Sequence, residues 1–152
     1  MIKLGWMARG TDESAYESQI RFASEMRLDV IDFHIGEMPR GAAFLRRVKE
    51  MCVKAGLPVG YLGIPGGFAG TDGDAKVEKA RADVDTAALL SAQMVRVFAG
   101  SQWPETVEEQ EALWAPMIGR FQALSDYATQ KGIVVALQNH NDSSFAMTAD
   151  QV

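Results

Sequence analysis

The chain has 152 residues, of which 47% are hydrophobic and 23% charged, a balance typical of soluble globular proteins. Its formal net charge of −5 argues against a nucleic-acid-binding or anionic-membrane surface. The single cysteine, Cys52, excludes an intrachain disulfide, and its place on an apolar helical stripe favours a core residue over a nucleophile. No signal-peptide pattern opens the sequence and no apolar run approaches the roughly 18 residues of a membrane span, so we expect a cytoplasmic protein.

Five short apolar segments rich in β-branched or aromatic residues predict strands, at about residues 2–8, 29–35, 58–64, 94–99 and 133–139. The longer segments between them carry apolar residues at helical spacing. The first predicted helix, about 13–26, depends on Tyr16, Ile20 and Ala23. The stripes of the other three contain Phe44, Val48, Met51, Cys52 and Ala55; Val77, Ala80, Val84, Ala87 and Ala88; and Trp114, Met117, Ile118, Phe121, Leu124 and Ala128.

Helix start and stop signals support these elements. Gly56 and Gly132 follow predicted helix ends, where the chain needs a left-handed residue, and Thr106 stands at capping-box spacing from Glu109. The alternation of strands and helices predicts an α/β fold with a parallel sheet buried on both faces. Two architectures fit: an open doubly wound sheet, or a partial (β/α)8 TIM barrel of about five βα units, with residues 1–152 as a single, incomplete domain.

The loops discriminate between these architectures. Ala8-Arg9-Gly10-Thr11 follows the first predicted strand, where a dinucleotide-binding sheet would have Gly-x-Gly-x-x-Gly. The five glycines of residues 63–73 match neither that turn nor a P-loop. We interpret this segment as a mobile βα loop, or alternatively as a loop that closes over a ligand at the rim of the barrel. Thr148-Ala149-Asp150-Gln151 repeats the capping-box spacing near the end of the chain, which we expect to reflect truncation or completion by a second chain.

Polar side chains at strand ends are the candidate site residues. The fifth predicted strand runs into Gln138-Asn139-His140-Asn141, at the rim where (β/α) barrels carry out their chemistry. Period-two alternation puts Asp32 and His34 on one face of the second strand, and Gln138 and His140 on one face of the fifth. A polar pair in an apolar strand favours a pocket role for Asp32 and His34, although a hydrated His34 beyond the strand end is the alternative.

Three further residues have two interpretations each. Arg96, inside the Val95-Arg96-Val97-Phe98 strand, is either an anion contact in the barrel interior or a member of a structural ion pair. His140, with Asn139 beside it, either contacts the substrate or is a satisfied loop histidine. Trp6 either stacks on a sugar or packs in the core.

Three segments of the sequence resemble the xylose isomerase-like TIM barrels, the sugar phosphate isomerase/epimerase superfamily. They are Val30-Ile31-Asp32-Phe33, the run AALLSAQMVRVFAG from Ala87 to Gly100, and GIVVALQNH from Gly132 to His140. Their order and spacing are similar to those of the first five strands of the family, over essentially the whole chain. A complete member has eight strands and about 250 residues or more.

The resemblance implies a divalent cation, Mn, Mg, Co or Zn, held at the rim by carboxylates and a histidine from strands five to eight. Such a cation polarises a sugar carbonyl while a carboxylate moves the neighbouring proton. The family's strand five supplies a glutamate, but the matching residue is Gln138, which offers a metal an amide oxygen without charge and cannot act as a base. Asp32 stands where the family often has an inward glutamate, and His140 resembles its rim histidine.

These observations lead to three hypotheses. The first is a sugar or sugar phosphate isomerase or epimerase that is inactive as this chain alone and acts through metal-assisted proton transfer in the complete barrel. The second is a non-catalytic sugar-binding or self-associating half-barrel, a homo-oligomer through the open edges of its sheet. The third, an apurinic-site endonuclease-like phosphodiesterase, is disfavoured by only two histidines and a net acidic charge.

Overall fold

The computed structural model describes residues 2–100 and 106–140. Strands and helices alternate along them: β1 (Gly5–Ala8), α1 (Glu13–Glu25), β2 (Val30–His34), α2 (Ala42–Lys54), β3 (Val59–Gly63), α3 (Gly73–Leu90), β4 (Met94–Phe98), α4 (Val107–Thr129) and β5 (Val134–Gln138). Each strand falls within one of the five predicted ranges. The predicted helix start at residues 148–151 lies outside the described residues, as does Asn141.

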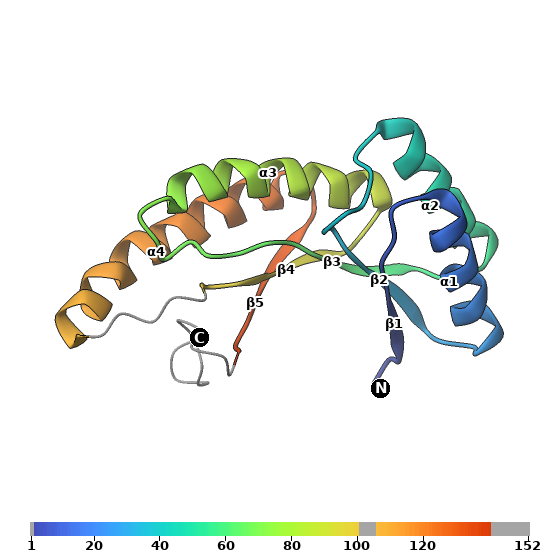
Figure 1. Ribbon diagram of the computed structural model, residues 1–152, viewed down its shortest axis with the longest axis horizontal. Helices are drawn as coiled ribbons and strands as arrows, with labels where there is room; N and C mark the ends of the chain where they lie inside the picture. The colour runs from blue at the N-terminus through green and yellow to red at the C-terminus, as the bar shows by residue number, and fades with distance from the viewer. Residues whose placement is uncertain (1, 101–105, 141–152) are drawn as a thin grey trace.

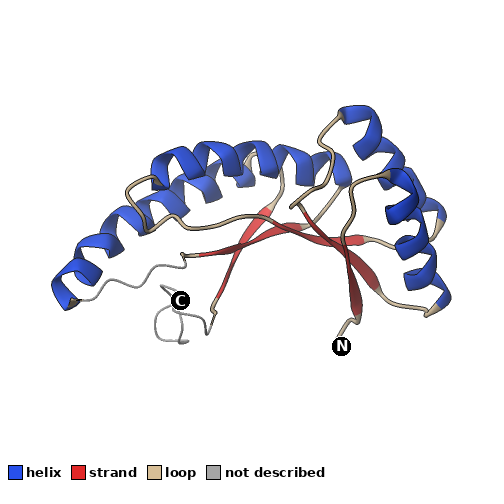
Figure 2. Cartoon of the chain, viewed as in Figure 1, coloured by secondary structure: helices blue, strands red, loops and turns tan. Residues whose placement is uncertain are grey.

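The strands form one parallel sheet in the order β1-β2-β3-β4-β5. The helices of the described chain lie on one side of this curved sheet, with α3 alongside α4 and α1 alongside α2 (Figures 1 and 2). A doubly wound sheet reverses its strand order and carries helices on both faces, whereas here each strand neighbours the next one along the chain. The architecture is that of five consecutive strands of a TIM barrel with their helices, so the barrel prediction is confirmed.

In β2 and β4, alternate residues point toward the helices and form the core. Ile31 and Phe33 of β2 are fully buried, as are Val95 and Val97 of β4. Burying a large apolar side chain contributes about 1.5–3 kcal/mol, so these positions fix which face of each strand meets the helices. The opposite face, which we call the inner face, carries the residues in between.

The helix signals read from the sequence are confirmed. Thr106 accepts a hydrogen bond from the Glu109 N–H, and the Glu109 side chain accepts one from the Thr106 N–H. Gly56 and Gly132 have φ values of +69° and +70°. Cys52 is buried, as predicted, and burial raises the pKa of its thiol to about 12. Among the described residues, no helix has both the length and the apolar character needed to cross a membrane.

One stripe prediction is wrong in part. Met117, Leu124 and Ala128 of α4 are buried, but Ile118 is 48% exposed. The buried residues follow one another at steps of seven and four, which keeps them on one line of the helix. Ile118 is rotated by about 100° from Met117 and therefore lies on the flank of that line.

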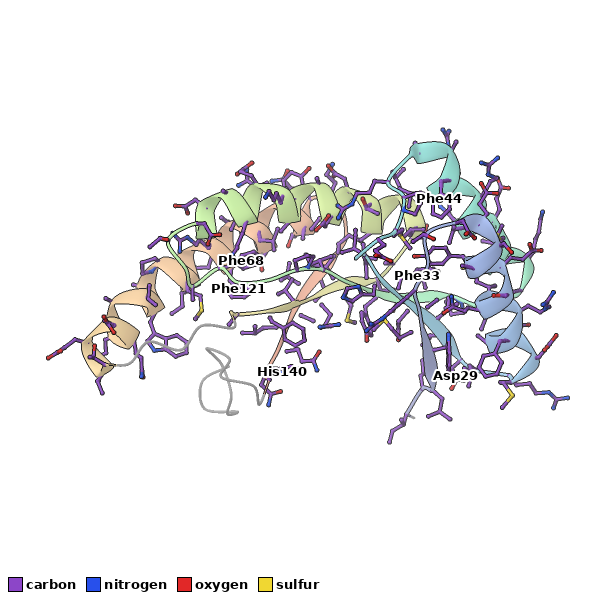
Figure 3. The ribbon with its side chains drawn as sticks, in the orientation of Figure 1. Asp29, Phe33, Phe44, Phe68, Phe121 and His140 are labelled. Atoms are coloured by element: carbon purple, nitrogen blue, oxygen red, sulfur yellow. The ribbon has the colours of Figure 1, made fainter. Side chains whose placement is uncertain are left out.

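The β3–α3 loop is packed rather than free, which argues against the mobility expected from its glycines. Phe68 has no exposed surface, and its ring lies 5.0 Å from that of Phe121 on α4, edge to face. Figure 3 shows the two rings side by side under the helices. Arg120 donates to the carbonyl oxygens of Phe68 (2.7 Å) and Gly70 (3.0 Å) and also pairs with Asp74 (2.8 Å). The helix that follows β4 thereby holds the loop that follows β3.

Candidate functional site

The inner face gathers most of the predicted site residues at the carboxyl ends of the strands. Side chains of directly paired residues share a face, and the register pairs His34 with Gly63, Gly63 with Arg96, and Phe98 with Gln138. His34, Arg96 and Gln138 therefore face the same side, away from the helices. The expected alternation of Asp32 with His34 on β2 is present, since the helix-facing positions are Ile31 and Phe33.

Trp6 does not join this group. It pairs in register with the helix-facing residue Ile31, and its ring contacts Phe22 of α1 at 4.8 Å. Its indole N–H donates to Gln19 Oε1 at 3.4 Å. Of the two interpretations, sugar stacking and core packing, the position of Trp6 agrees with packing, because its ring lies against a helix. Trp6 is therefore not part of the inner face.

Asp32 is tied to an irregularity of the neighbouring strand. Between the pairs Ile31–Val59 and Phe33–Leu62, β3 contains one residue more than β2, which is a β-bulge. The Tyr61 N–H donates to Asp32 Oδ1 at 3.0 Å. A Cβ on Gly60 would overlap Oδ1, and one on Gly5 would lie 3.0 Å from Oδ2. Burial raises the pKa of Asp32, and the hydrogen bond from the Tyr61 N–H opposes this effect. Asp32 thus stabilises the bulge from the inner face.

His34 lies nearer the ends of the strands. A Cβ on Gly36 would lie 2.8 Å from Nδ1 of its ring, and one on Gly63 would lie 3.6 Å from Cδ2, so the imidazole stands between two glycines. Burial lowers the pKa of His34, and the positive charges of Arg9 and Arg96 lower it further. This shift favours the neutral imidazole, which has one N–H donor and one nitrogen acceptor.

Arg96 occupies the middle of the inner face. Its guanidinium carbon lies 4.4 Å from the centre of the Phe98 ring and 5.7 Å from that of Tyr61, both within cation–π range. Nε is buried without a hydrogen-bond partner among the described residues. The structural ion pair considered for Arg96 is not formed within residues 2–100 and 106–140.

The remaining predicted site residues lie at the end of β5. Gln138 and Asn139 are exposed. The His140 ring lies 5.0 Å from that of Phe98, nearly perpendicular to it. Figure 3 shows His140 just past β5, at the end of the sheet away from α3 and α4. The rim placement predicted for this histidine agrees with the structure.

The inner face of the described chain does not fit a divalent cation. Within residues 2–100 and 106–140, no three His, Cys, Asp or Glu side chains come together as a ligand set. Gln138, which matches the family's glutamate, is a neutral amide, and the inner face also carries the guanidinium of Arg96 and the carboxylate of Asp32, which is engaged with the Tyr61 N–H. A hard cation needs several oxygen ligands, preferably charged, so residues beyond those described would have to hold it.

A groove of about 480 Å³ lies elsewhere, beside α3 and the β3–α3 loop. Arg40, Lys76 and Lys79 line it together with Asp83, a buried carboxylate that pairs with Arg40. None of the candidate site residues predicted from the sequence contributes to its wall.

The inner face includes residues that sequence reasoning missed. Tyr61 and Phe98 flank the guanidinium of Arg96, and Gly63 makes room between His34 and Arg96. The signal for Gly63 was available, because an isolated glycine within a strand often marks the close approach of another group.

These observations bear on the family of the chain. A family model described as xylose isomerase-like TIM barrel matches residues 20–152. The chain belongs to the xylose isomerase-like TIM-barrel family. Among curated proteins, none matches the sequence significantly.

Solved structures with the same fold as this family member include three sugar 3-epimerases. An L-ribulose 3-epimerase aligns with a TM-score of 0.80 and 14% identity, over 95% of this chain and 52% of its own. A D-psicose 3-epimerase, solved in the presence of D-fructose, gives 0.75 and 16%, over 93% and 54%. The D-allulose 3-epimerase of Methylomonas sp., solved with D-allulose, gives 0.72 and 18%, over 94% and 53%. The chain spans about half the length of these neighbours, and such identities establish the fold alone.

Proposed function

We propose that the chain contributes the first five strands of a sugar or sugar phosphate isomerase or epimerase, and that its inner face binds the sugar. The observation that carries this proposal is the convergence of His34, Arg96, Gln138 and His140 at the carboxyl ends of three strands. TIM-barrel enzymes bind and transform their substrates at this end. The structural neighbours are named as ketose 3-epimerases, which favours a ketose as the ligand.

The side chains offer distinct contacts to such a ligand. His34 and Arg96 present hydrogen-bond donors, while Gln138 and Asn139 present amide groups that both donate and accept. Asp32, engaged with the Tyr61 N–H, supports the floor of the site, and Trp6 stays outside it. The base that moves a proton next to the carbonyl is not among these residues, because Gln138 has no basic group.

The divalent cation implied by the family resemblance belongs to the complete barrel in this proposal. When bound, it would polarise the sugar carbonyl. Gln138 would offer it one neutral oxygen at most, and the remaining ligands and the base would come from outside the described residues. We therefore expect this chain alone to bind the sugar without converting it. The buried, unpaired Cys52 fits a cytoplasmic protein.

Solvent exchange tests the proposal directly. The full-length protein is incubated in D2O with D-fructose or D-allulose and Mn²⁺ or Co²⁺, and the sugar is followed by proton NMR. An epimerase exchanges the C3 proton and an isomerase a C1 proton, and removal of the cation by EDTA should stop either exchange. Gln138→Glu, which restores the family's carboxylate, should raise metal affinity, whereas Gln130→Glu at the exposed end of α4 should leave it unchanged. Absence of exchange at both carbons, together with no binding of either sugar, would refute the proposal.

A non-catalytic or self-associating half-barrel is the second candidate. It is favoured by the two outer strands, since β1 and β5 each have one neighbour in the described sheet and Val134 of β5 is 60% exposed. Light scattering on the purified chain tests it. A stable monomer whose β1 and β5 amides exchange slowly would exclude association through these edges. Nothing in the described residues favours the apurinic-site endonuclease hypothesis.

A further inference from the structure

One row of residues crosses the inner face at the level of His34. The register runs from His34 on β2 to Gly63 on β3, Arg96 on β4 and Ala136 on β5. Large polar side chains therefore alternate with a glycine and an alanine. A Cβ on Gly63 would lie 2.9 Å from Arg96 Nη2 and 3.6 Å from His34 Cδ2, so the two side chains meet over the glycine, and Arg96 Nη2 takes up the space that a Cβ would need. We call the place over Gly63 where these two side chains meet the Gly63 gap.

The guanidinium of Arg96 lies against two aromatic rings and pairs with no carboxylate within residues 2–100 and 106–140. Its central carbon lies over the ring of Phe98 at 4.4 Å and over that of Tyr61 at 5.7 Å. Nε is buried and has no partner among the described residues, and no ion pair to Arg96 is formed within them. A buried donor without an acceptor is costly, whereas an oxyanion on a guanidinium makes short, charge-assisted bonds. An anionic oxygen is an acceptor that would satisfy this donor.

The surroundings of the gap are positive as well. Arg9 and Arg96 both act on His34 and lower its pKa, in addition to the effect of burial. The carboxylate nearest in the strands, Asp32, lies two residues before His34 and is engaged with the Tyr61 N–H. An anion in the gap would thus meet one permanent cation, one imidazole N–H and no competing carboxylate from the row itself.

We propose that Arg96 and His34 bind an anionic group of the ligand, a carboxylate or a phosphate, in the Gly63 gap. This inference rests on the proposed function in one respect, that the rest of the ligand is a sugar. It adds that the preferred ligand is charged, in contrast to the neutral ketoses D-allulose and D-fructose named for the structural neighbours. Gly63 is required for this arrangement, because a Cβ at this position would lie 2.9 Å from Arg96 Nη2 and displace the guanidinium.

The experiment compares four probes by isothermal titration calorimetry on the purified chain: D-fructose, D-fructose 6-phosphate, D-glucuronate and inorganic phosphate. We expect either the phosphorylated or the carboxylated sugar to bind at least about tenfold more tightly than D-fructose, as one charge-assisted hydrogen bond allows. Whichever of these two sugars binds more tightly shows whether the site prefers a phosphate or a carboxylate. Equal affinity for D-fructose and both charged sugars would overturn the inference while leaving the proposed function intact. If inorganic phosphate binds and none of the three sugars does, the inference is supported and the proposed function is refuted.

Variants test whether Arg96 and Gly63 cause the preference for a charged sugar. Arg96→Met should remove the preference for the charged sugar, and Gly63→Ala should weaken it. The matched control is Arg81→Met, since Arg81 on α3 also has a buried Nε without a described partner and also lies over a tyrosine, Tyr127 at 5.5 Å. Circular dichroism confirms that each variant is folded. Unchanged preference in both Arg96→Met and Gly63→Ala, or equal loss in Arg81→Met, would overturn the proposal.

A second readout does not depend on affinity. The chain contains two histidines, so the imidazole of His34 can be followed by NMR against His140. An anion in the gap should raise the pKa of His34, because it offsets the positive charges that lower it. Phosphate that leaves this pKa unchanged while binding elsewhere would contradict the assignment.

Discussion

Replacing Asp32 tests whether its carboxylate holds the β3 bulge together. In Asp32→Ala the Tyr61 N–H loses its acceptor at 3.0 Å. An unsatisfied buried donor costs about 1–3 kcal/mol, and partial burial of this site puts the expected loss at about 1–2 kcal/mol. For a chain of this length that corresponds to a decrease of roughly 2–8 °C in Tm. Asp32→Asn keeps an acceptor oxygen and removes the charge, so we expect it to be at least as stable as the wild type at pH 7.

The pH dependence of stability provides a second test of Asp32, and its direction can be predicted. Burial raises the pKa of Asp32 above its ordinary value of 3.8, so the folded protein binds this proton more tightly than the unfolded chain. The resulting stabilisation is complete below the unfolded pKa and is lost as the pH rises through the folded value. Wild type should therefore lose stability relative to Asp32→Asn as the pH increases from about 3.5 to 7.

Thermal and urea unfolding followed by circular dichroism measure both effects. The comparison between wild type and Asp32→Asn cancels the other carboxylates, whose titration the two proteins share. Two results would refute the reasoning: an Asp32→Ala variant within about 0.5 kcal/mol of the wild type, or an Asp32→Asn variant as unstable as Asp32→Ala.

Three further predictions address other parts of the fold. Gly66→Ala should cost about 1–3 kcal/mol or more, because its Cβ would overlap the backbone of Phe98, whereas Gly119→Ala, in an open position of α4, should gain about 0.5–1 kcal/mol in the same urea titration. Cys52, whose thiol pKa is raised to about 12, should react with a thiol reagent only after unfolding, and rapid native labelling would contradict its burial. Thr106→Ala should cost about 1 kcal/mol through loss of the α4 cap, whereas Thr106→Ser should restore most of it.

Local patterns predicted much of this structure because they depend on neighbours in sequence. The alternation of Asp32 with His34 and the spacing of Tyr16, Ile20 and Ala23 each follow from the geometry of one element. The position of Arg96 within β4 was predicted for the same reason. Its choice between an anion contact and an ion pair was not, because that depends on which groups other strands bring near it.

Features that depend on pairing between elements could not be predicted. The bulge at Tyr61 exists only in register with β2, and its carboxylate partner is 29 residues away. Trp6 lies in a short apolar strand whose sequence does not say which face meets the helices. Asp83 interrupts the apolar stripe of α3, and its burial depends on Arg40, 43 residues earlier in the chain.

The bond between Arg120 and the β3–α3 loop has a consequence for the order of folding. Its two carbonyl acceptors, on Phe68 and Gly70, precede it by 52 and 50 residues. During synthesis this loop therefore emerges well before the helix that fixes it. Because the loop leaves β3 directly after Gly63, we expect docking of α4 on the loop to affect the position of that glycine as well. Ligand binding at Gly63 and the local unfolding of α4 are thus expected to be thermodynamically linked.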